Sequence, residues 1–128
     1  MKLTIAFLSL IVLSGCASNL QKEHFTAYKN HTYTTDQAKY NKADVWTPSL
    51  NGDCEDYALY MRQRAGGNLL HVTTQQGEAH MVLDVNGTIV DNLSKVVYPR
   101  SEMKHKIVYQ LTETHIRQFL KARGLNSK

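Results

Sequence analysis

The spacing of apolar residues changes along this chain, and each spacing predicts a different element. From Cys54 the apolar positions recur every three or four residues, as on one face of a helix, and Gly66 ends that run. A second helical pattern starts at Thr112. Between the two helices lie four β-prone stretches, Leu69 to Thr74, Ala79 to Val85, Thr88 to Leu93 and His105 to Gln110. This order predicts an α+β fold in which a helix packs on an antiparallel sheet.

One turn between two of these strands brings a histidine and a carboxylate together. Asn86 and Gly87 separate two β-prone stretches, and Asn-Gly is the strongest short signal for a two-residue hairpin turn. With that turn, His80 and Asp91 become diagonal neighbours on one face, with Cα atoms about 7–8 Å apart. A slip of one residue would place them on opposite faces. The turn therefore predicts a side-chain pair between His80 and Asp91.

Cys54 is the candidate nucleophile for this pair. It lies in the first turn of its helix, where free N–H groups and the helix dipole lower a thiol pKa. A protonated His80 would lower that pKa further, whereas Glu55 and Asp56 act in the opposite direction. Taken singly, Cys54, His80 and Asp91 could be a core cysteine, a strand histidine and a turn carboxylate. Taken together, they favour a Cys-His-Asp catalytic arrangement.

The N-terminus has the pattern of an exported lipoprotein. The apolar run from Leu3 to Leu13 is shorter than the about 20 residues of a membrane-spanning helix, and it fits a secretory signal. Leu-Ser-Gly before Cys16 resembles a bacterial lipobox, which implies cleavage after Gly15 and lipidation of Cys16. An ordinary secretory signal is the alternative. We expect a signal peptide over 1–15, a lipidated N-terminus and tether over 16–35, and a catalytic domain over 36–128.

Length, charge and the residue after Cys16 limit the number of domains, the kind of partner and the location that we expect. A chain of 128 residues allows one domain, and a formal net charge of +4 with scattered basic residues does not indicate nucleic-acid binding. Ala17 after the lipidated cysteine resembles outer-membrane sorting. The expected location is therefore the bacterial cell envelope, on the outer membrane and facing the periplasm.

Three motifs resemble one family. The string GDCEDYA from Gly52 to Ala58 resembles the nucleophile motif of the bacterial transglutaminase-like cysteine proteinases. The segments His80–Leu83 and Val90–Leu93 resemble that family's histidine and aspartate motifs, and Asp44–Pro48 is similar to the segment that precedes its cysteine. The resemblance implies a papain-like transglutaminase core with Cys54, His80 and Asp91 as the triad.

The resemblance also implies a cofactor and a substrate class. Some relatives are calcium-dependent periplasmic proteases that release surface adhesins, and acidic residues beside their cysteine bind the ion. Asp53 and Glu55 match those positions. Two carboxylates are few for Ca²⁺, which takes six to eight oxygen ligands, so the reaction itself is expected to need no cofactor. The expected partners are a protein or peptide substrate and the membrane that holds the lipid.

The expected reaction is acyl transfer through a thioester on Cys54, with Trp46 as a candidate wall of the cleft and the Cys54 backbone N–H as an oxyanion donor. The stretch between Cys54 and His80 is shorter than is typical of the family, so the target does not follow from the resemblance. Two alternatives remain open. One is a cell-wall peptidase, and the other is a non-catalytic lipoprotein that binds an envelope partner.

Overall fold

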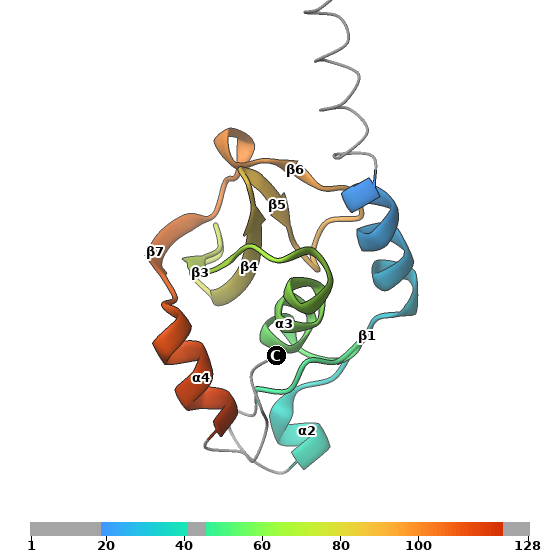
Figure 1. The fold of residues 1–128 in the computed structure, drawn as a ribbon, viewed down its shortest axis with the longest axis vertical. Coiled ribbons are helices and arrows are strands. Elements are labelled where there is room, and N and C mark those ends of the chain that lie inside the picture. The colour runs from blue at the N-terminus through green and yellow to red at the C-terminus, as the bar shows by residue number, and fades with distance from the viewer. Residues whose placement is uncertain (1–18, 41–45, 122–128) are drawn as a thin grey trace, which may run out of the picture.

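The computed structural model describes residues 19–40 and 46–121. Its centre is a five-stranded antiparallel sheet with the strand order β6-β5-β4-β3-β7. The strands are β3 (Asn68–Thr73), β4 (Ala79–Val85), β5 (Thr88–Val90), β6 (Tyr98–Pro99) and β7 (Lys106–Gln110). Helix α3 (Cys54–Ala65) packs against one face of this sheet (Figure 1). The α+β class predicted from the sequence is confirmed.

Smaller elements surround this centre. A helix over residues 19–30 lies beside α3, and α4 (Glu113–Lys121) lies on the opposite flank (Figure 1). Strands β1 (Thr32–Tyr33) and β2 (Asn51–Gly52) form a separate parallel pair ahead of α3. Helix α2 (Asp36–Tyr40) follows β1, and the short 3-10 helix η1 (Arg100–Glu102) links β6 to β7.

The predicted hairpin has the predicted register. Leu83 pairs with Val90 and Val85 with Thr88. The two turn residues, Asn86 at φ 51° and Gly87 at φ 89°, both lie in the left-handed region that a tight primed hairpin turn requires. The β5 strand ends at Val90, three residues before the predicted end. Asp91 therefore follows the strand directly.

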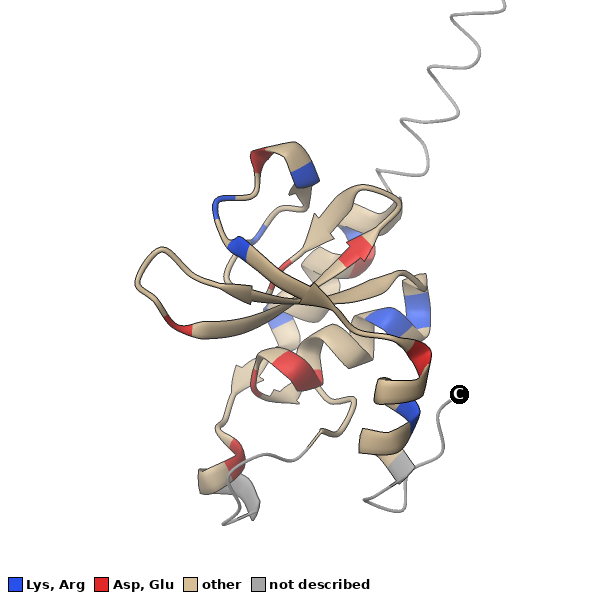
Figure 2. Ribbon diagram, turned by 90° about the vertical axis from the view of Figure 1, so that its left-hand side faces the viewer, with Lys and Arg blue, Asp and Glu red and all other residues tan. Residues whose placement is uncertain are grey.

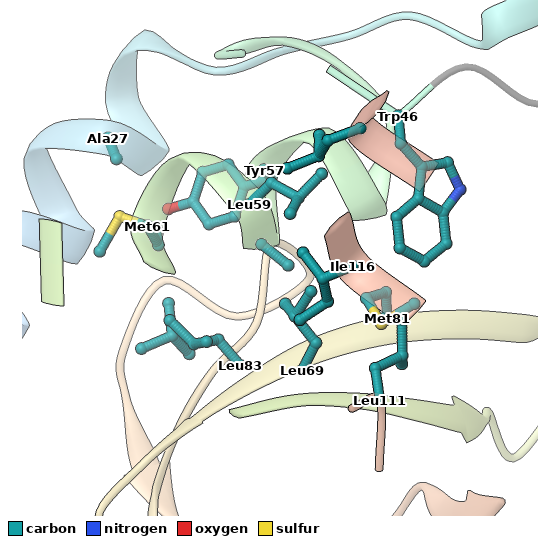
Figure 3. Packing of buried hydrophobic residues seen from close by; sticks show 13 residues of the cluster. Ala27, Trp46, Tyr57, Leu59, Met61, Leu69, Met81, Leu83, Leu111 and Ile116 are labelled. Atoms are coloured by element: carbon teal, nitrogen blue, oxygen red, sulfur yellow. The ribbon is translucent and has the colours of Figure 1, made fainter. Parts of the chain in front are cut away.

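Each face of the sheet has its own hydrophobic core. The larger core lies under α3, where Tyr57 and Met61 meet Leu69 and Leu83 (Figure 3). The smaller core lies on the opposite face, where strand alternation places Leu70, Val72, Val82 and Ile89. Tyr98, Met103 and Ile107 cover the smaller core, and these residues come from β6, from β7 and from the connection between them. The chain between β6 and β7 therefore crosses the face that α3 leaves open.

The tether expected over residues 16–35 is wrong for its described part. Residues 19–30 form a helix that packs on the domain, with His24 and Ala27 buried. Leu20, His24 and Ala27 are spaced four and three residues apart, so they share one helix face despite the polar composition around them. Gln21 adds a bond to the loop after β5 by accepting a hydrogen bond from the Val97 N–H at 2.7 Å.

Several expectations fall outside the described residues. These are the signal peptide over 1–15, Cys16, Asp44 and the C-terminal end of the last helix at Gly124. Within the described ranges, none of the helices has the length and apolar character needed to cross a membrane. Basic and acidic residues are interspersed over the loop after β5, η1, α3 and α4 (Figure 2).

Candidate active site

The hairpin brings His80 and Asp91 into direct contact. His80 lies in β4, and its Nε2 is 2.8 Å from Asp91 Oδ1. Both side chains are buried, at 6% and 2% exposure. The backbone N–H of Leu93 also donates to Oδ1, at 3.0 Å. The structure thus contains the predicted side-chain pair.

The second oxygen of Asp91 is also bonded. Tyr98 donates its hydroxyl hydrogen to Oδ2 at 3.0 Å, and His105 Nε2 lies 2.8 Å from the same oxygen. Burial alone raises the pKa of Asp91, but the hydrogen bonds from His80 and the Leu93 N–H outweigh it and hold the pKa well below its usual range. Asp91 is therefore a carboxylate that stays ionised inside the protein.

Cys54 occupies the first position of α3 and is partly buried. Its Sγ donates a hydrogen bond to Glu55 Oε2 at 3.2 Å. Burial and the Glu55 charge raise the pKa of this thiol, although a backbone hydrogen bond from Met81 opposes them. The pKa lowering expected from the helix start is therefore wrong for this state of the protein. The reason is that the Cys54 sulfur is buried and the Glu55 side chain turns back toward it. The negative charge of Glu55 then disfavours a thiolate beside it.

Cys54 and His80 share the walls of two cavities. One has a volume of about 270 Å³ and is lined by both residues together with Trp46, His71 and Phe119. Trp46 stacks on Phe119 with ring centroids 4.3 Å apart. The predicted cleft-wall position of Trp46 agrees with this lining, and the indole is also part of the core. This half of the cleft is aromatic.

The other cavity has a volume of about 350 Å³ and is lined by the same two residues. Tyr33, Asn92 and Leu93 line it. Tyr33 and Leu93 are more than half exposed, whereas Asn92 is buried and its Oδ1 has no hydrogen-bond partner among the described residues. Cys54 and His80 therefore line both an aromatic cavity and a second cavity that contains the buried Asn92.

Asp56 folds the segment that carries Trp46. Its Oδ1 accepts a hydrogen bond from the Thr47 N–H at 2.8 Å, and its backbone carbonyl accepts one from the Ser49 N–H. Gly52 lies against this carboxylate, because a Cβ there would come within 2.2 Å of Asp56 Oδ2. The GDCED string therefore contains a loop anchor as well as the cysteine.

Three carboxylates gather near Cys54. Asp36, Asp53 and Glu55 each offer an oxygen within 4.8 Å of the others. Burial and the Glu55 carboxylate raise the pKa of Asp53 to about 7, and Asp53 Oδ1 is buried without a hydrogen-bond partner among the described residues. Asp53 occupies the N-cap position of α3, but its side chain makes no capping hydrogen bond. Such a set of oxygen atoms fits the ligand chemistry of Ca²⁺.

A second group with metal-ligating side chains consists of His80, Asp91 and His105. Here the ring Nε2 atoms lie at hydrogen-bond distance from the two oxygens of Asp91. These hydrogen bonds account for the arrangement without an ion.

Comparison with known proteins decides the family. The model of the bacterial transglutaminase-like cysteine proteinases matches residues 17–125. The chain belongs to this family. By its description, this is a family of cysteine proteinases. No curated protein matches the chain.

A solved structure supports the same fold. Legionella pneumophila LapG is 19% identical in sequence and superposes with a TM-score of 0.56. The similar part covers 76% of this chain and 66% of the LapG chain, so this chain spans less than two thirds of LapG. The helix-on-antiparallel-sheet architecture is therefore the transglutaminase-like fold predicted from the motifs.

The sequence did not identify every residue around the cleft. Asp36 precedes the cysteine by 18 positions, and His105 follows Asp91 by 14. Neither residue lies in a motif, and both reach the site through connections whose paths no local pattern predicts. The β1–β2 pairing was likewise not predicted, although it lies next to the first turn of α3.

Proposed function

We propose that this protein is a membrane-anchored periplasmic cysteine peptidase with Cys54 as nucleophile, His80 as base and Asp91 as the residue that orients His80. One observation carries the proposal: the 2.8 Å contact between His80 Nε2 and Asp91 Oδ1, at the side of a cleft that His80 shares with Cys54. Family membership supports the same class of chemistry.

The mechanism follows from which nitrogen of the His80 ring is hydrogen-bonded to Asp91. Because Nε2–H donates to Asp91, the lone pair of His80 lies on Nδ1. His80 Nδ1 takes the thiol proton, the thiolate attacks the amide carbonyl, and the imidazolium returns the proton to the leaving amine. Water then hydrolyses the thioester. In the free protein the thiol donates to Glu55, so the thiol must turn from Glu55 to His80 for the reaction to begin.

The backbone supplies the electrostatic part. The Cys54 N–H stands at the start of α3, where helix N–H groups lack internal partners. It is our candidate for the oxyanion donor, since the developing negative charge lies next to the attacked carbonyl carbon.

The substrate is an extended peptide that crosses both cavities. Its residue on the aromatic side is apolar, because Trp46, Phe119 and Met81 line that cavity. Phe119→Ala opens this wall without touching Cys54 or His80. We expect it to change the preferred residue in a library of quenched decapeptides while alkylation of Cys54 by iodoacetamide stays unchanged.

The test of the triad uses Cys54 itself. We expect His80→Ala to slow iodoacetamide alkylation of Cys54 at pH 7 and to abolish hydrolysis of the decapeptide library. Cys54→Ala abolishes both signals, which assigns them to this residue. Alkylation that proceeds equally well without His80 would contradict the proposal.

Anchoring is proposed through a lipid on Cys16, on the outer membrane and facing the periplasm. It is supported by the Leu-Ser-Gly-Cys string after the apolar N-terminal run. Incorporation of an alkyne-labelled fatty acid into the wild-type chain but not into Cys16→Ser tests the lipid. Fractionation of the two bacterial membranes tests the location.

Calcium binding by Asp36, Asp53 and Glu55 is a further part of the proposal. A bound cation would relieve the repulsion among these carboxylates and hold the Glu55 oxygen that now accepts the thiol hydrogen bond. We expect CaCl₂ to raise the melting temperature of the wild type but not of Asp36→Asn. An equal rise with both proteins would exclude this site.

One observation favours a second candidate, a non-catalytic lipoprotein. The raised pKa of Cys54 is what an inert thiol would show. A cell envelope phenotype that survives Cys54→Ala would favour this alternative over the peptidase, whereas digestion of purified sacculi would identify a cell-wall peptidase.

A further inference from the structure

Beyond the three triad residues, we propose that His105 is a positioning residue that fixes Asp91 and, through it, the tautomer of His80. The inference rests on the proposed function, since it assigns a role around the same aspartate. The family motifs do not include His105, which lies immediately before β7.

Each oxygen of Asp91 has its own pair of donors. Oδ1 receives His80 Nε2 and the Leu93 N–H, and Oδ2 receives His105 Nε2 and the Tyr98 hydroxyl. The carboxylate plane is thereby held from both ends. If the Oδ2 donors were absent, the Asp91 carboxylate could rotate about the Cβ–Cγ bond, and Oδ1 would leave the direction that His80 requires.

The backbone delivers His105 to this place by a long crossing. From β6 the chain passes over the smaller core to the far edge of the sheet, and Met103 and Ile107 pack into that core on either side of His105. Lys106 then pairs with Thr73 in β3, which fixes the register of the residue before it. The His105 ring meets the His80 ring edge to face, with centroids 5.2 Å apart.

The surroundings of the His105 ring favour the tautomer with the proton on Nε2, which faces Asp91. Its Nδ1 is buried and has no hydrogen-bond partner among the described residues. A proton on Nδ1 would have no acceptor there, and a buried N–H without an acceptor is costly. In the Nε2–H tautomer, His105 gives Asp91 a hydrogen bond without cancelling its charge. That charge stays available to the imidazolium that forms on His80.

Two variants of His105 separate the hydrogen bond from the ring. The amide of glutamine can donate from nearly the position of Nε2, whereas alanine donates nothing. In the full-length protein, long-range ¹H–¹⁵N spectra of the His80 ring report its tautomer, and iodoacetamide alkylation of Cys54 at pH 7 reports the base. We expect His105→Ala to mix the two His80 tautomers and to slow alkylation about tenfold, the effect of losing one hydrogen bond to a charged group.

In His105→Gln, the His80 ring should keep a single Nε2–H tautomer. The rate of Cys54 alkylation should stay within about twofold of the wild-type rate. His115→Ala, which removes an exposed imidazole on α4, is the matched control and should change neither signal. Tyr98→Phe removes a donor from the same oxygen without opening a cavity, so it carries the test if His105→Ala does not fold. It should slow alkylation about threefold.

An unchanged tautomer and rate in His105→Ala would overturn the inference, and so would a loss in His105→Gln as large as that in His105→Ala. If the His105→Ala protein does not fold, an unchanged alkylation rate in Tyr98→Phe would overturn the inference. His80→Ala distinguishes this failure from that of the proposed function. If removing His80 has no effect on alkylation, the triad fails; if only the His105 variants have no effect, the triad stands and the positioning role does not.

Discussion

Two acidic centres flank the cleft, and they are built in opposite ways. Asp91 receives four hydrogen bonds from described residues, and its pKa lies well below the usual range. Asp53 lies among other carboxylates, and burial together with Glu55 raises its pKa to about 7. Both carboxylates are desolvated, so burial alone does not determine the state of a carboxylate. The hydrogen-bond donors and the charged groups around it decide which form is favoured.

The contrast assigns different tasks to the two sides of the cleft. The donor-rich side is already organised and can stabilise a positive charge on His80 as that charge forms. On the acidic side, the Cys54 thiol is held as a hydrogen-bond donor to Glu55. On this view the histidine side is ready before substrate or cation arrives, and the cysteine side is not.

The strongest way to break the contrast is Asp91→Asn. Its amide keeps the shape but can present N–H to His80 Nε2, which favours the wrong tautomer. We expect hydrolysis of the decapeptide library to fall by about 10³-fold or more, as for similar replacements in other triads. Asp84→Asn is the matched control. Asp84 is a buried carboxylate of the same sheet that pairs with Arg100, so its loss should lower the melting temperature and leave the alkylation rate of Cys54 unchanged.

The next largest effect is expected for His24, which contacts the loop that follows Asp91. His24 bonds the Ser94 carbonyl through Nε2 and the Tyr57 hydroxyl through Nδ1, so it ties the helix over residues 19–30 to the loop after Asp91. We expect His24→Ala to lower the free energy of unfolding by about 2–3 kcal/mol, because it leaves buried polar groups unpaired. Urea denaturation measures this value. Full stability in the variant would mean that the helix does not hold that loop.

On the acidic side, we expect a smaller change in the free energy of unfolding, and this change should be an increase. Asp53→Asn removes one charge from the cluster with Asp36 and Glu55. Without calcium we expect the free energy of unfolding at pH 8 to rise by about 1 kcal/mol, since like charges at short range repel. The stabilisation by calcium should disappear in the same variant. If the substitution destabilised the calcium-free protein, the cluster would not be repulsive.

The same local chemistry explains what could be predicted from the sequence. Asn86 and Gly87 set the hairpin register within four residues, so the pairing of His80 with Asp91 followed from local geometry. The start of α3 at Cys54 was equally local, since turn residues and an apolar stripe define it. Both features depend on neighbours along the chain, and single-sequence patterns record such neighbours well.

The remaining residues of the site depend on paths through space. His105 reaches Asp91 only because the chain crosses the smaller core, and Asp36 reaches Asp53 only through the β1–β2 pairing. The thiol pKa was predicted in the wrong direction for a similar reason: the helix dipole is visible in the sequence, but the direction of the Glu55 side chain is not. Tertiary contacts determined these features.

The smallest predicted effect is a pH dependence at His24. Burial lowers the pKa of His24, while the Ser94 carbonyl and the Asp91 charge oppose the shift; Tyr57 and Tyr28 also face the ring. The unfolded chain therefore binds a proton at His24 before the folded chain does, and stability is lost as pH falls below about 6.5. We expect the wild type to lose more stability than His24→Gln between pH 7 and pH 5. Parallel curves from urea denaturation would assign the pH dependence to other groups.

If Cys16 carries the proposed lipid, the helix over residues 19–30 would also limit the distance between the membrane and the cleft. Only Ala17 and Ser18 separate Cys16 from the first described helical residue. With a lipid on Cys16, the folded domain would begin at most about 11 Å from the anchored residue, since each residue spans at most about 3.6 Å. A flexible tether over residues 16–35 would have allowed the domain to move several times farther from the lipid anchor. The protein would then cut only those chains that pass close to the bilayer surface, so the distance of a cleavage site from the membrane would itself select the substrate.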